Sequence, residues 1–193
     1  IFLEEAVESI LHQTLKPSEV VIVEDGPLTP ELYQVLDKLT AQSSIPIKRC
    51  PLEQNRGLGL ALQYGVLQCQ YDVIARMDTD DIAVEDRFEQ QFDLMEKENL
   101  DLLGGHIAEF IDQPDEIVSY RRVPIKHEEI IAYQRMRSAF NHMTVMFKRE
   151  MVLKAGNYED GLYMEDDLLW LNMISAGART GNVDQILCKV RVG

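Results

Sequence analysis

The chain has 193 residues, a length that suits one domain with one sizeable core, and its apolar fraction of 46% is that of an ordinary globular protein. The formal net charge of −14 argues against general affinity for nucleic acid or anionic lipid, so an anionic ligand would need a local device such as a bridging metal ion. No stretch approaches about 18 consecutive apolar residues, so we expect no membrane-spanning helix.

The first half of the chain alternates between helical and strand patterns. Apolar spacing predicts an amphipathic helix over residues 2–13, and a β-branched run predicts a buried strand over residues 19–24. Thr29 before Pro30 indicates a helix start, a short strand follows at residues 45–49, a third helix follows Gly57, and another strand covers residues 72–76. Each unit is near the length of a βαβ repeat, which predicts an α/β fold with three layers and a mostly parallel central sheet.

The second half is less regular. We expect helices over residues 86–98, 126–137 and 164–176, strands over residues 100–104, 143–147, 179–183 and 186–192, and a hairpin within residues 107–120 that turns at residues 113–115. No repeat or linker is visible, so residues 1–193 are expected to form a single domain. Because the chain opens with a helix instead of a strand, we expect this domain to be cut at both ends, with its first strand upstream of Ile1.

An acidic cluster follows the apolar run at residues 73–75. Asp78, Asp80 and Asp81 arrive within four residues, where the end of a core strand would place them at the rim of the sheet. Carboxylates two residues apart can face one point when the backbone turns, so they can hold a hard divalent ion. The alternative is a solvated acidic loop that caps the next helix.

Two further motifs indicate a ligand site in the first half. Asp25, at the end of an early strand and before a glycine, could accept hydrogen bonds from a nucleotide base, although a turn aspartate would have the same pattern. Arg56 lies in an Asn-Arg-Gly-Leu-Gly run, where glycines at a helix start let phosphate approach the free N–H groups. A tight turn into a helix explains that run equally well.

The third acidic group lies at the start of the helix expected over residues 164–176. Acids in a first helical turn are stabilised by the helix dipole, which is the plain interpretation of Glu165, Asp166 and Asp167. The functional interpretation is a general base that takes the proton of an acceptor hydroxyl. His142, before the strand expected at residues 143–147, is a weaker candidate, because a lone histidine is more often a hydrogen-bonded structural residue.

The order of these motifs is more specific than any one of them. Strand-Asp-Gly, Asn-Arg-Gly, strand-Asp-Thr-Asp-Asp, Asn-His-Met-Thr-Val-Met-Phe-Lys and Glu-Asp-Asp-Leu-Leu-Trp together resemble the inverting family 2 glycosyltransferases of the GT-A fold. The resemblance covers nearly the whole chain. Within the family it is similar to the bacterial capsular and exopolysaccharide enzymes of the amylovoran type.

The resemblance implies a role for each matching residue. Asp25 would contact uracil, Asp78 would face the nucleotide, and Asp80 would hold the Mn²⁺ or Mg²⁺ that bridges the diphosphate. Arg56 lies where the family often has a basic residue near the donor, and Asp166 matches the proposed catalytic base. Asp81, Glu165, Asp167 and His142 remain secondary candidates. Asn172 departs from the pattern, because many members have arginine there.

We therefore expect an inverting, metal-dependent glycosyltransferase. It would move a sugar from a nucleotide-diphospho-sugar, a UDP-sugar by resemblance, to a glycan or lipid-linked glycan in cell-surface polysaccharide synthesis. The resemblance places it in the cytoplasm, with peripheral association of the full-length protein at the inner face of the plasma membrane, and no nucleic-acid partner is expected. Two alternatives stay open: a sugar-nucleotide nucleotidyltransferase and a non-catalytic nucleotide-binding module.

Overall fold

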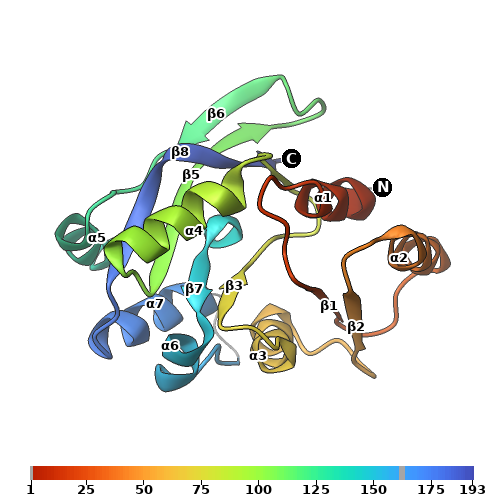
Figure 1. The fold of residues 1–193 in the computed structure, drawn as a ribbon, viewed down its shortest axis with the longest axis horizontal. Coiled ribbons are helices and arrows are strands. Elements are labelled where there is room, and N and C mark those ends of the chain that lie inside the picture. Colours follow the sequence, from red (N-terminus) through yellow and green to blue (C-terminus); the bar gives the residue numbers. More distant parts are fainter. Residues whose placement is uncertain (1, 161–163) are drawn as a thin grey trace.

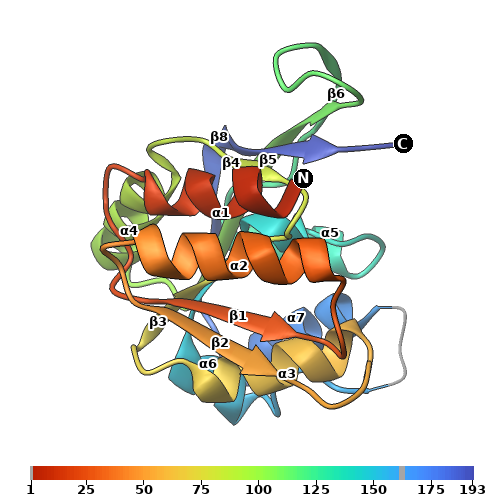
Figure 2. The same cartoon turned by 90° about the vertical axis from the view of Figure 1, so that its right-hand side faces the viewer.

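A computed structural model of the chain describes residues 2–160 and 164–193. Helices cover both faces of a central sheet, and a smaller two-stranded sheet lies to one side of it (Figures 1 and 2). The α/β class and the three layers expected from the sequence are therefore present. None of the helices in the described part of the chain is long and apolar enough to span a bilayer.

The first five elements build the smaller sheet and its helices. They are α1 (Phe2–Leu11), β1 (Val20–Glu24), α2 (Pro30–Gln42), β2 (Ile47–Pro51) and α3 (Leu58–Gln68). The start of α2 follows its sequence signal, because the Thr29 hydroxyl accepts a hydrogen bond from the Leu32 N–H and Pro30 occupies the first turn. β1 and β2 pair in parallel, so the carboxyl ends of both strands lie at one edge of this sheet.

The remaining elements build the central sheet. They are β3 (Val73–Ala75), β4 (Ile82–Ala83), α4 (Arg87–Glu98), β5 (Leu102–Phe110), β6 (Ile117–Arg121), α5 (His127–Gln134), the 3₁₀ helix η1 (His142–Thr144), β7 (Met146–Lys148), α6 (Arg149–Lys154), α7 (Glu165–Ser175) and β8 (Thr180–Arg191). The strand order is β3-β7-β5-β8-β4, and β6 pairs with β5.

Strand direction differs from the mostly parallel sheet expected from the sequence. The β1–β2 and β5–β8 pairs are parallel, whereas β3–β7, β4–β8, β5–β6 and β5–β7 are antiparallel. The reason is that a short apolar run identifies a buried strand but carries no information about its partner or direction. The regular alternation of the first half therefore did not extend to the central sheet, whose strands come mainly from the second half.

Several element boundaries also differ. The strand expected at residues 100–104 and the first strand of the hairpin form one strand, β5, and the two closing strands form one strand, β8. Gly105 lies within β5 and does not end the strand. Its lack of a side chain makes room for Leu187, because a β-carbon at this position would lie 2.5 Å from Leu187 Cδ1. Register shifts between β5 and β8 absorb the polar residues 184–185. β4, η1 and α6 were not expected.

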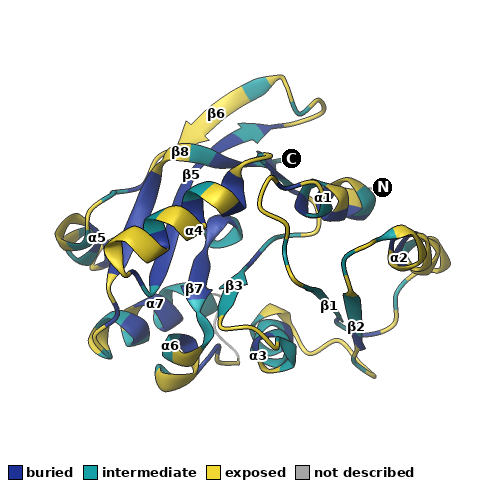
Figure 3. Ribbon diagram, viewed as in Figure 1, coloured by how far each residue is buried: buried dark blue, intermediate teal, exposed yellow. Residues whose placement is uncertain are grey.

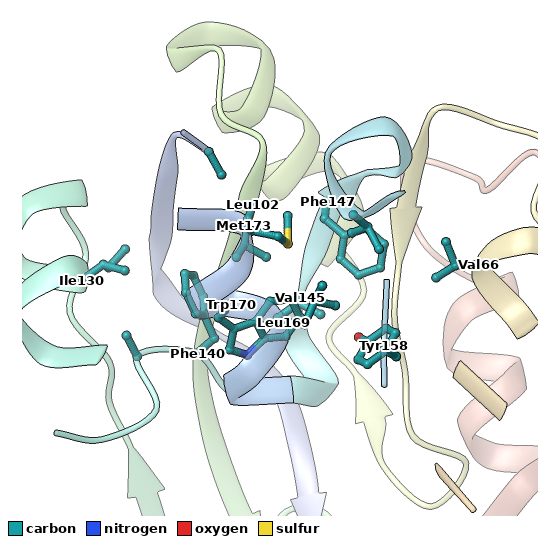
Figure 4. Close-up of a cluster of buried hydrophobic side chains, with 13 residues drawn as sticks. Val66, Leu102, Ile130, Phe140, Val145, Phe147, Tyr158, Leu169, Trp170 and Met173 are labelled. Atoms are coloured by element: carbon teal, nitrogen blue, oxygen red, sulfur yellow. The ribbon is translucent and has the colours of Figure 1, made fainter. Parts of the chain in front are cut away.

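The core lies on both faces of the central sheet because successive strand residues point to opposite sides. Leu102 packs with α7, where Trp170 is fully buried, whereas its neighbour Leu103 packs with α4. Figure 3 shows this burial along β5, β7 and β8. Figure 4 shows Phe140 and Leu169 beside Trp170 in the first cluster, and the Phe140 and Trp170 ring centroids are 5.7 Å apart. This cluster fixes α7, which carries the candidate base.

Candidate active site

The structure brings the Asp25 motif and the Arg56 loop into contact. Asp25 follows β1, and its two carboxylate oxygens accept the N–H groups of Arg56 (2.7 Å) and Gly57 (3.0 Å). Gly26 has a φ of +91°, and a β-carbon there would lie 2.7 Å from the Asn55 nitrogen. Two motifs about 30 residues apart in the sequence thus form one rigid corner at the start of α3, with the Arg56 side chain exposed.

The three carboxylates of the acidic cluster lie in three different environments. Asp78 Oδ2 accepts a hydrogen bond from Arg76 Nη1 at 2.6 Å. Asp80 is exposed and makes no side-chain hydrogen bond or ion pair within residues 2–160 and 164–193. Asp81 is buried and accepts the Arg191 N–H (3.0 Å), and burial raises its pKa to about 6, with Asp78 and Asp80 adding to the rise. Asp80 is therefore the carboxylate best placed to take an external ligand.

A fully buried arginine supports this acidic loop from behind. The Arg87 guanidinium donates to the carbonyl oxygen of Arg76 (2.7 Å), directly before the loop, and to Gln91 Oε1 (2.9 Å). No carboxylate in the described residues lies within ion-pair distance of it. Burial lowers its pKa, as expected for a cation removed from water. A buried cation held by neutral acceptors is costly, so it implies a role beyond packing.

Asp166 lies in the first turn of α7 beside a buried pair of aromatic side chains. Its Oδ2 is 3.8 Å from His142 Nδ1, and His142 Nε2 is 3.0 Å from the Tyr158 hydroxyl. Burial raises the pKa of Asp166, lowers the pKa of His142 well below its ordinary value and raises that of Tyr158. Tyr158 therefore stays protonated. A hydrogen bond from its hydroxyl to His142 Nε2 would leave the ring proton of a neutral histidine on Nδ1, facing Asp166.

The corner formed by Asp25 and the Arg56 loop meets the Asp166 region at the starts of α3 and α7. A β-carbon on Gly59 would lie 2.5 Å from the Glu159 carbonyl oxygen and 3.5 Å from Glu165 Cβ, so the Arg56 loop adjoins the acidic turn of α7. Arg76 connects the other side: it pairs with Asp78, and its charge further lowers the pKa of the buried His142. Asp167 is not directed to the same point, because Gln134 Nε2 donates to its Oδ1 at 2.7 Å.

Two places offer oxygen ligands for a divalent ion. Asp80, with the remaining oxygen of Asp78, has the hard donor set that Mn²⁺ and Mg²⁺ prefer, and nothing in the described chain neutralises Asp80. His142, Glu165 and Asp166 form a second group, with one ligand atom from each lying within 4.8 Å of the others. The residues present thus fit a metal at the acidic loop.

The sequence analysis missed three residues that contact the candidate site residues or the acidic loop: Arg76, Arg87 and Tyr158. Arg76 stands two residues before Asp78, so its proximity to the acidic cluster was a usable signal. Arg87 and Tyr158 gave no such signal, because each reaches the site through contacts with residues far away in the chain: Arg87 contacts the carbonyl of Val145, and Tyr158 contacts His142.

The family described as glycosyl transferase family 2 matches residues 2–157. Among curated relatives, the amylovoran biosynthesis glycosyltransferase AmsE of Erwinia amylovora is 41% identical over 192 residues, covering 99% of this chain and 71% of AmsE. The UDP-Gal:alpha-D-GlcNAc-diphosphoundecaprenol beta-1,3-galactosyltransferase of Escherichia coli is 37% identical, with coverage of 99% and 69%.

Solved structures share the fold at low sequence identity. Staphylococcus aureus TarS 1–349 in complex with UDP-GlcNAc has a TM-score of 0.79 at 15% identity, covering 99% of this chain and 55% of that one. The mannosyltransferase PcManGT of Pyrobaculum calidifontis, in complex with GDP-Man and Mn²⁺, has a TM-score of 0.74 at 16% identity, with coverage of 100% and 53%. This chain therefore spans little more than half of those proteins, and the likeness confirms the expected GT-A fold.

Proposed function

The chain belongs to glycosyl transferase family 2, and we propose that it transfers a sugar from a UDP-sugar to a hydroxyl of a glycan or lipid-linked glycan, with inversion. The proposal places this reaction in the synthesis of exopolysaccharide, capsule or another cell-surface glycan, as the names of its relatives suggest. It includes a cytoplasmic location, with peripheral contact at the inner face of the plasma membrane. The nucleotidyltransferase and binding-module alternatives are not favoured, because the family and the relatives are glycosyltransferases.

One observation carries the proposal: Asp166 lies half-buried beside a neutral His142, and its pKa is raised by burial. When it is ionised, a carboxylate of raised pKa is a stronger base than an exposed aspartate. It would take the proton of the acceptor hydroxyl while that oxygen attacks the anomeric carbon. The Nδ1–H of His142 would orient the carboxylate for this step.

The donor would lie between the Asp25 corner and the acidic loop. Asp25 holds the backbone of residues 56–57 and retains lone pairs that could accept a base N–H. The exposed Arg56 would approach the diphosphate, and Asp78, positioned by Arg76, would face the nucleotide. Asp80 would hold Mn²⁺ or Mg²⁺, which when bound stabilises the charge that develops on the leaving diphosphate. Arg76 and Arg87 add fixed positive charge close to that loop.

The direct test is calorimetric titration of the protein with UDP, with and without Mn²⁺ or Mg²⁺. We expect binding that requires the ion and weakens strongly in chelator. Binding that is equal in chelator would contradict the proposed role of Asp80, and no binding under either condition would remove the donor assignment. Transfer from UDP-[¹⁴C]sugars to lipid extracts would then identify the sugar and the acceptor.

A further inference from the structure

Two buried polar side chains of α4 contact the backbone of both segments that carry the candidate metal ligand and the histidine beside the candidate base. Arg87 and Gln91 stand about one helical turn apart, and both are fully buried. They are joined, because Arg87 Nε donates to Gln91 Oε1 at 2.9 Å. We call this pair the α4 bridge. It approaches from one face of the central sheet, since α4 packs on one face and α7, which carries Asp166, packs on the other (Figure 1).

One end of the α4 bridge holds the start of the acidic loop. Arg87 Nη2 donates to the carbonyl oxygen of Arg76 at 2.7 Å, two residues before Asp78. The same nitrogen donates at 3.4 Å to the carbonyl oxygen of Val145, which also accepts the Arg76 N–H at 2.9 Å. The guanidinium therefore joins the residue that follows β3 to the residue that precedes β7.

The other end of the α4 bridge holds the turn of His142. Gln91 Nε2 donates at 2.8 Å to the carbonyl oxygen of Thr144, the last residue of η1. Carbonyl groups at the end of a helix lack partners within it, so this bond supplies a donor that η1 cannot. His142 is the first residue of η1, and its Nδ1 is 3.8 Å from Asp166 Oδ2. The α4 bridge thus connects the acidic loop with the turn that places His142 beside the candidate base.

The chemistry of the α4 bridge indicates positioning more than packing. Apolar side chains of similar volume would pack at least as well, because a buried cation without a carboxylate partner loses its hydration. Within residues 2–160 and 164–193, no carboxylate lies at ion-pair distance from Arg87. A guanidinium directs several N–H groups at fixed angles, and an amide accepts and donates at once. The pair therefore fixes two backbone segments relative to each other.

We propose that Arg87 and Gln91 are positioning residues for sugar transfer, which hold the acidic loop and the turn of His142 in one fixed arrangement so that the bound donor faces Asp166. Neither side chain would touch a substrate, since both are fully buried. This role rests on the proposed function, whereas the connection between the two segments does not. Misplacing reacting groups by about 1 Å can cost about 100-fold in rate, so a remote pair can determine turnover.

Gln91→Glu separates the two ends of the α4 bridge. The carboxylate would still accept from Arg87 Nε and stay ionised beside that cation, but it could not donate to the carbonyl oxygen of Thr144. We expect kcat for transfer from a labelled UDP-sugar to lipid extract to fall about 10- to 100-fold, while the KM for the donor and metal-dependent UDP affinity stay within about threefold. Arg87→Lys keeps the charge but loses the planar fork, so it should also weaken UDP binding, by about tenfold.

Gln13→Glu is the matched control, because it makes the same change at another fully buried glutamine. Gln13 Nε2 donates to the carbonyl oxygen of Val84 (2.7 Å), and its Oε1 accepts the N–H of Phe88 in α4 (2.9 Å). These partners are neutral, so the buried charge should lower the melting temperature at least as much as it does in Gln91→Glu. The kcat per folded molecule of the control should nevertheless stay within about threefold of the parent value.

Trp170 provides a readout that needs no substrate. It is the single tryptophan of the chain, and its ring centroid lies 5.8 Å from that of His142. Its fluorescence should change in Gln91→Glu, because the His142 ring would move relative to the indole, and should match the parent in Gln13→Glu.

Four results would each overturn the proposal: parent-like kcat in Gln91→Glu, an equal loss of kcat per folded molecule in Gln13→Glu, a loss confined to the KM for the donor, or unchanged Trp170 fluorescence in Gln91→Glu. If Gln91→Glu fails to fold, Gln91→Met removes both hydrogen bonds of this side chain without adding a charge and provides the same comparison. A parent protein that binds no UDP and transfers no sugar would contradict the proposed function, and the Trp170 fluorescence of the variants would then decide whether the α4 bridge connects the two segments.

Discussion

Replacing Asp166 by asparagine tests the proposed base most directly. Asp166→Asn keeps the size of the side chain and an oxygen that can accept from His142, but it cannot take a proton at neutral pH. We expect transfer to fall by about 10²- to 10⁴-fold, which corresponds to about 3–5 kcal/mol of lost transition-state stabilisation. Affinity for the UDP-sugar should stay within a few fold, because Asp166 is proposed to act only on the acceptor.

The pH dependence gives this prediction a second readout. Because burial raises the pKa of Asp166, the acidic limb of the turnover profile should lie above the pKa of an ordinary aspartate and should be missing in the variant. A raised pKa in the fold also means that the stability contribution of Asp166 is complete at low pH and is lost as the pH rises through the folded pKa. At neutral pH the variant should therefore melt at or above the temperature of the parent.

Asp167→Asn is the matched control, since it makes the same change one residue away and keeps an oxygen that can accept from Gln134. Its turnover should remain near that of the parent. The assay is sugar transfer from the labelled donor at several pH values, beside donor titration and thermal melts. Parent-like transfer by Asp166→Asn with an unchanged melt would refute the reasoning, and Asp167 or Glu165 would become the next candidate.

Three further substitutions test the donor side. Asp80→Ala should abolish the metal dependence of UDP binding seen by calorimetry without lowering the melting temperature, because this carboxylate is exposed and unpaired within the described chain; a lower melting temperature would indicate a structural role instead. Gly26→Ala should destabilise the fold by about 2 kcal/mol or more in urea denaturation and weaken UDP binding, since the new β-carbon would collide with the backbone of Asn55 at a positive φ. Asp81 has a pKa of about 6 in the fold against 3.8 ordinarily, so the stabilisation by its protonated form, at most about 3 kcal/mol, is lost as the pH rises from about 4 through 6. Asp81→Asn in metal-free buffer should flatten the dependence of melting temperature on pH over that range, and an unchanged slope would contradict the assignment.

Most of the helices and strands could be predicted from local sequence because their signals are local. Thr29 and Pro30 act within one turn, and the alternation of Leu102 and Leu103 between two clusters follows from strand geometry. The sheet topology could not be predicted in this way, because strand pairing joins distant segments such as β3 and β7. The continuation of β5 through Gly104 and Gly105 depends on the room needed by Thr144 and Leu187, which no local pattern reveals.

The residues of the candidate site show the same division between local sequence signals and contacts over long sequence distances. The motif residues Asp25, Asp80 and Asp166 stand at the ends of predicted elements, where sequence reasoning is informative. The groups that tune them do not form motifs. Tyr158 contacts the ring of His142, 16 residues away in the chain, and burial raises the pKa of Asp166. Burial is a property of the assembled core, so neither the raised pKa nor the neutral histidine could be derived from the spacing of residues.

Arg76 and Arg87 would explain how an acidic chain could bind the nucleotide diphosphate of the proposed donor. The net charge of −14 describes the solvated surface, whereas these two cations lie inside the protein, against the loop of Asp78 and Asp80. A charge in a buried environment acts more strongly on its neighbours than the same charge in water. Arg76 neutralises Asp78. Arg87, which lacks a carboxylate partner within the described residues, contributes a positive charge at the carbonyl oxygen of Arg76, directly before the acidic loop. The loop can therefore present one carboxylate to a divalent ion without also repelling the phosphates that the ion would carry.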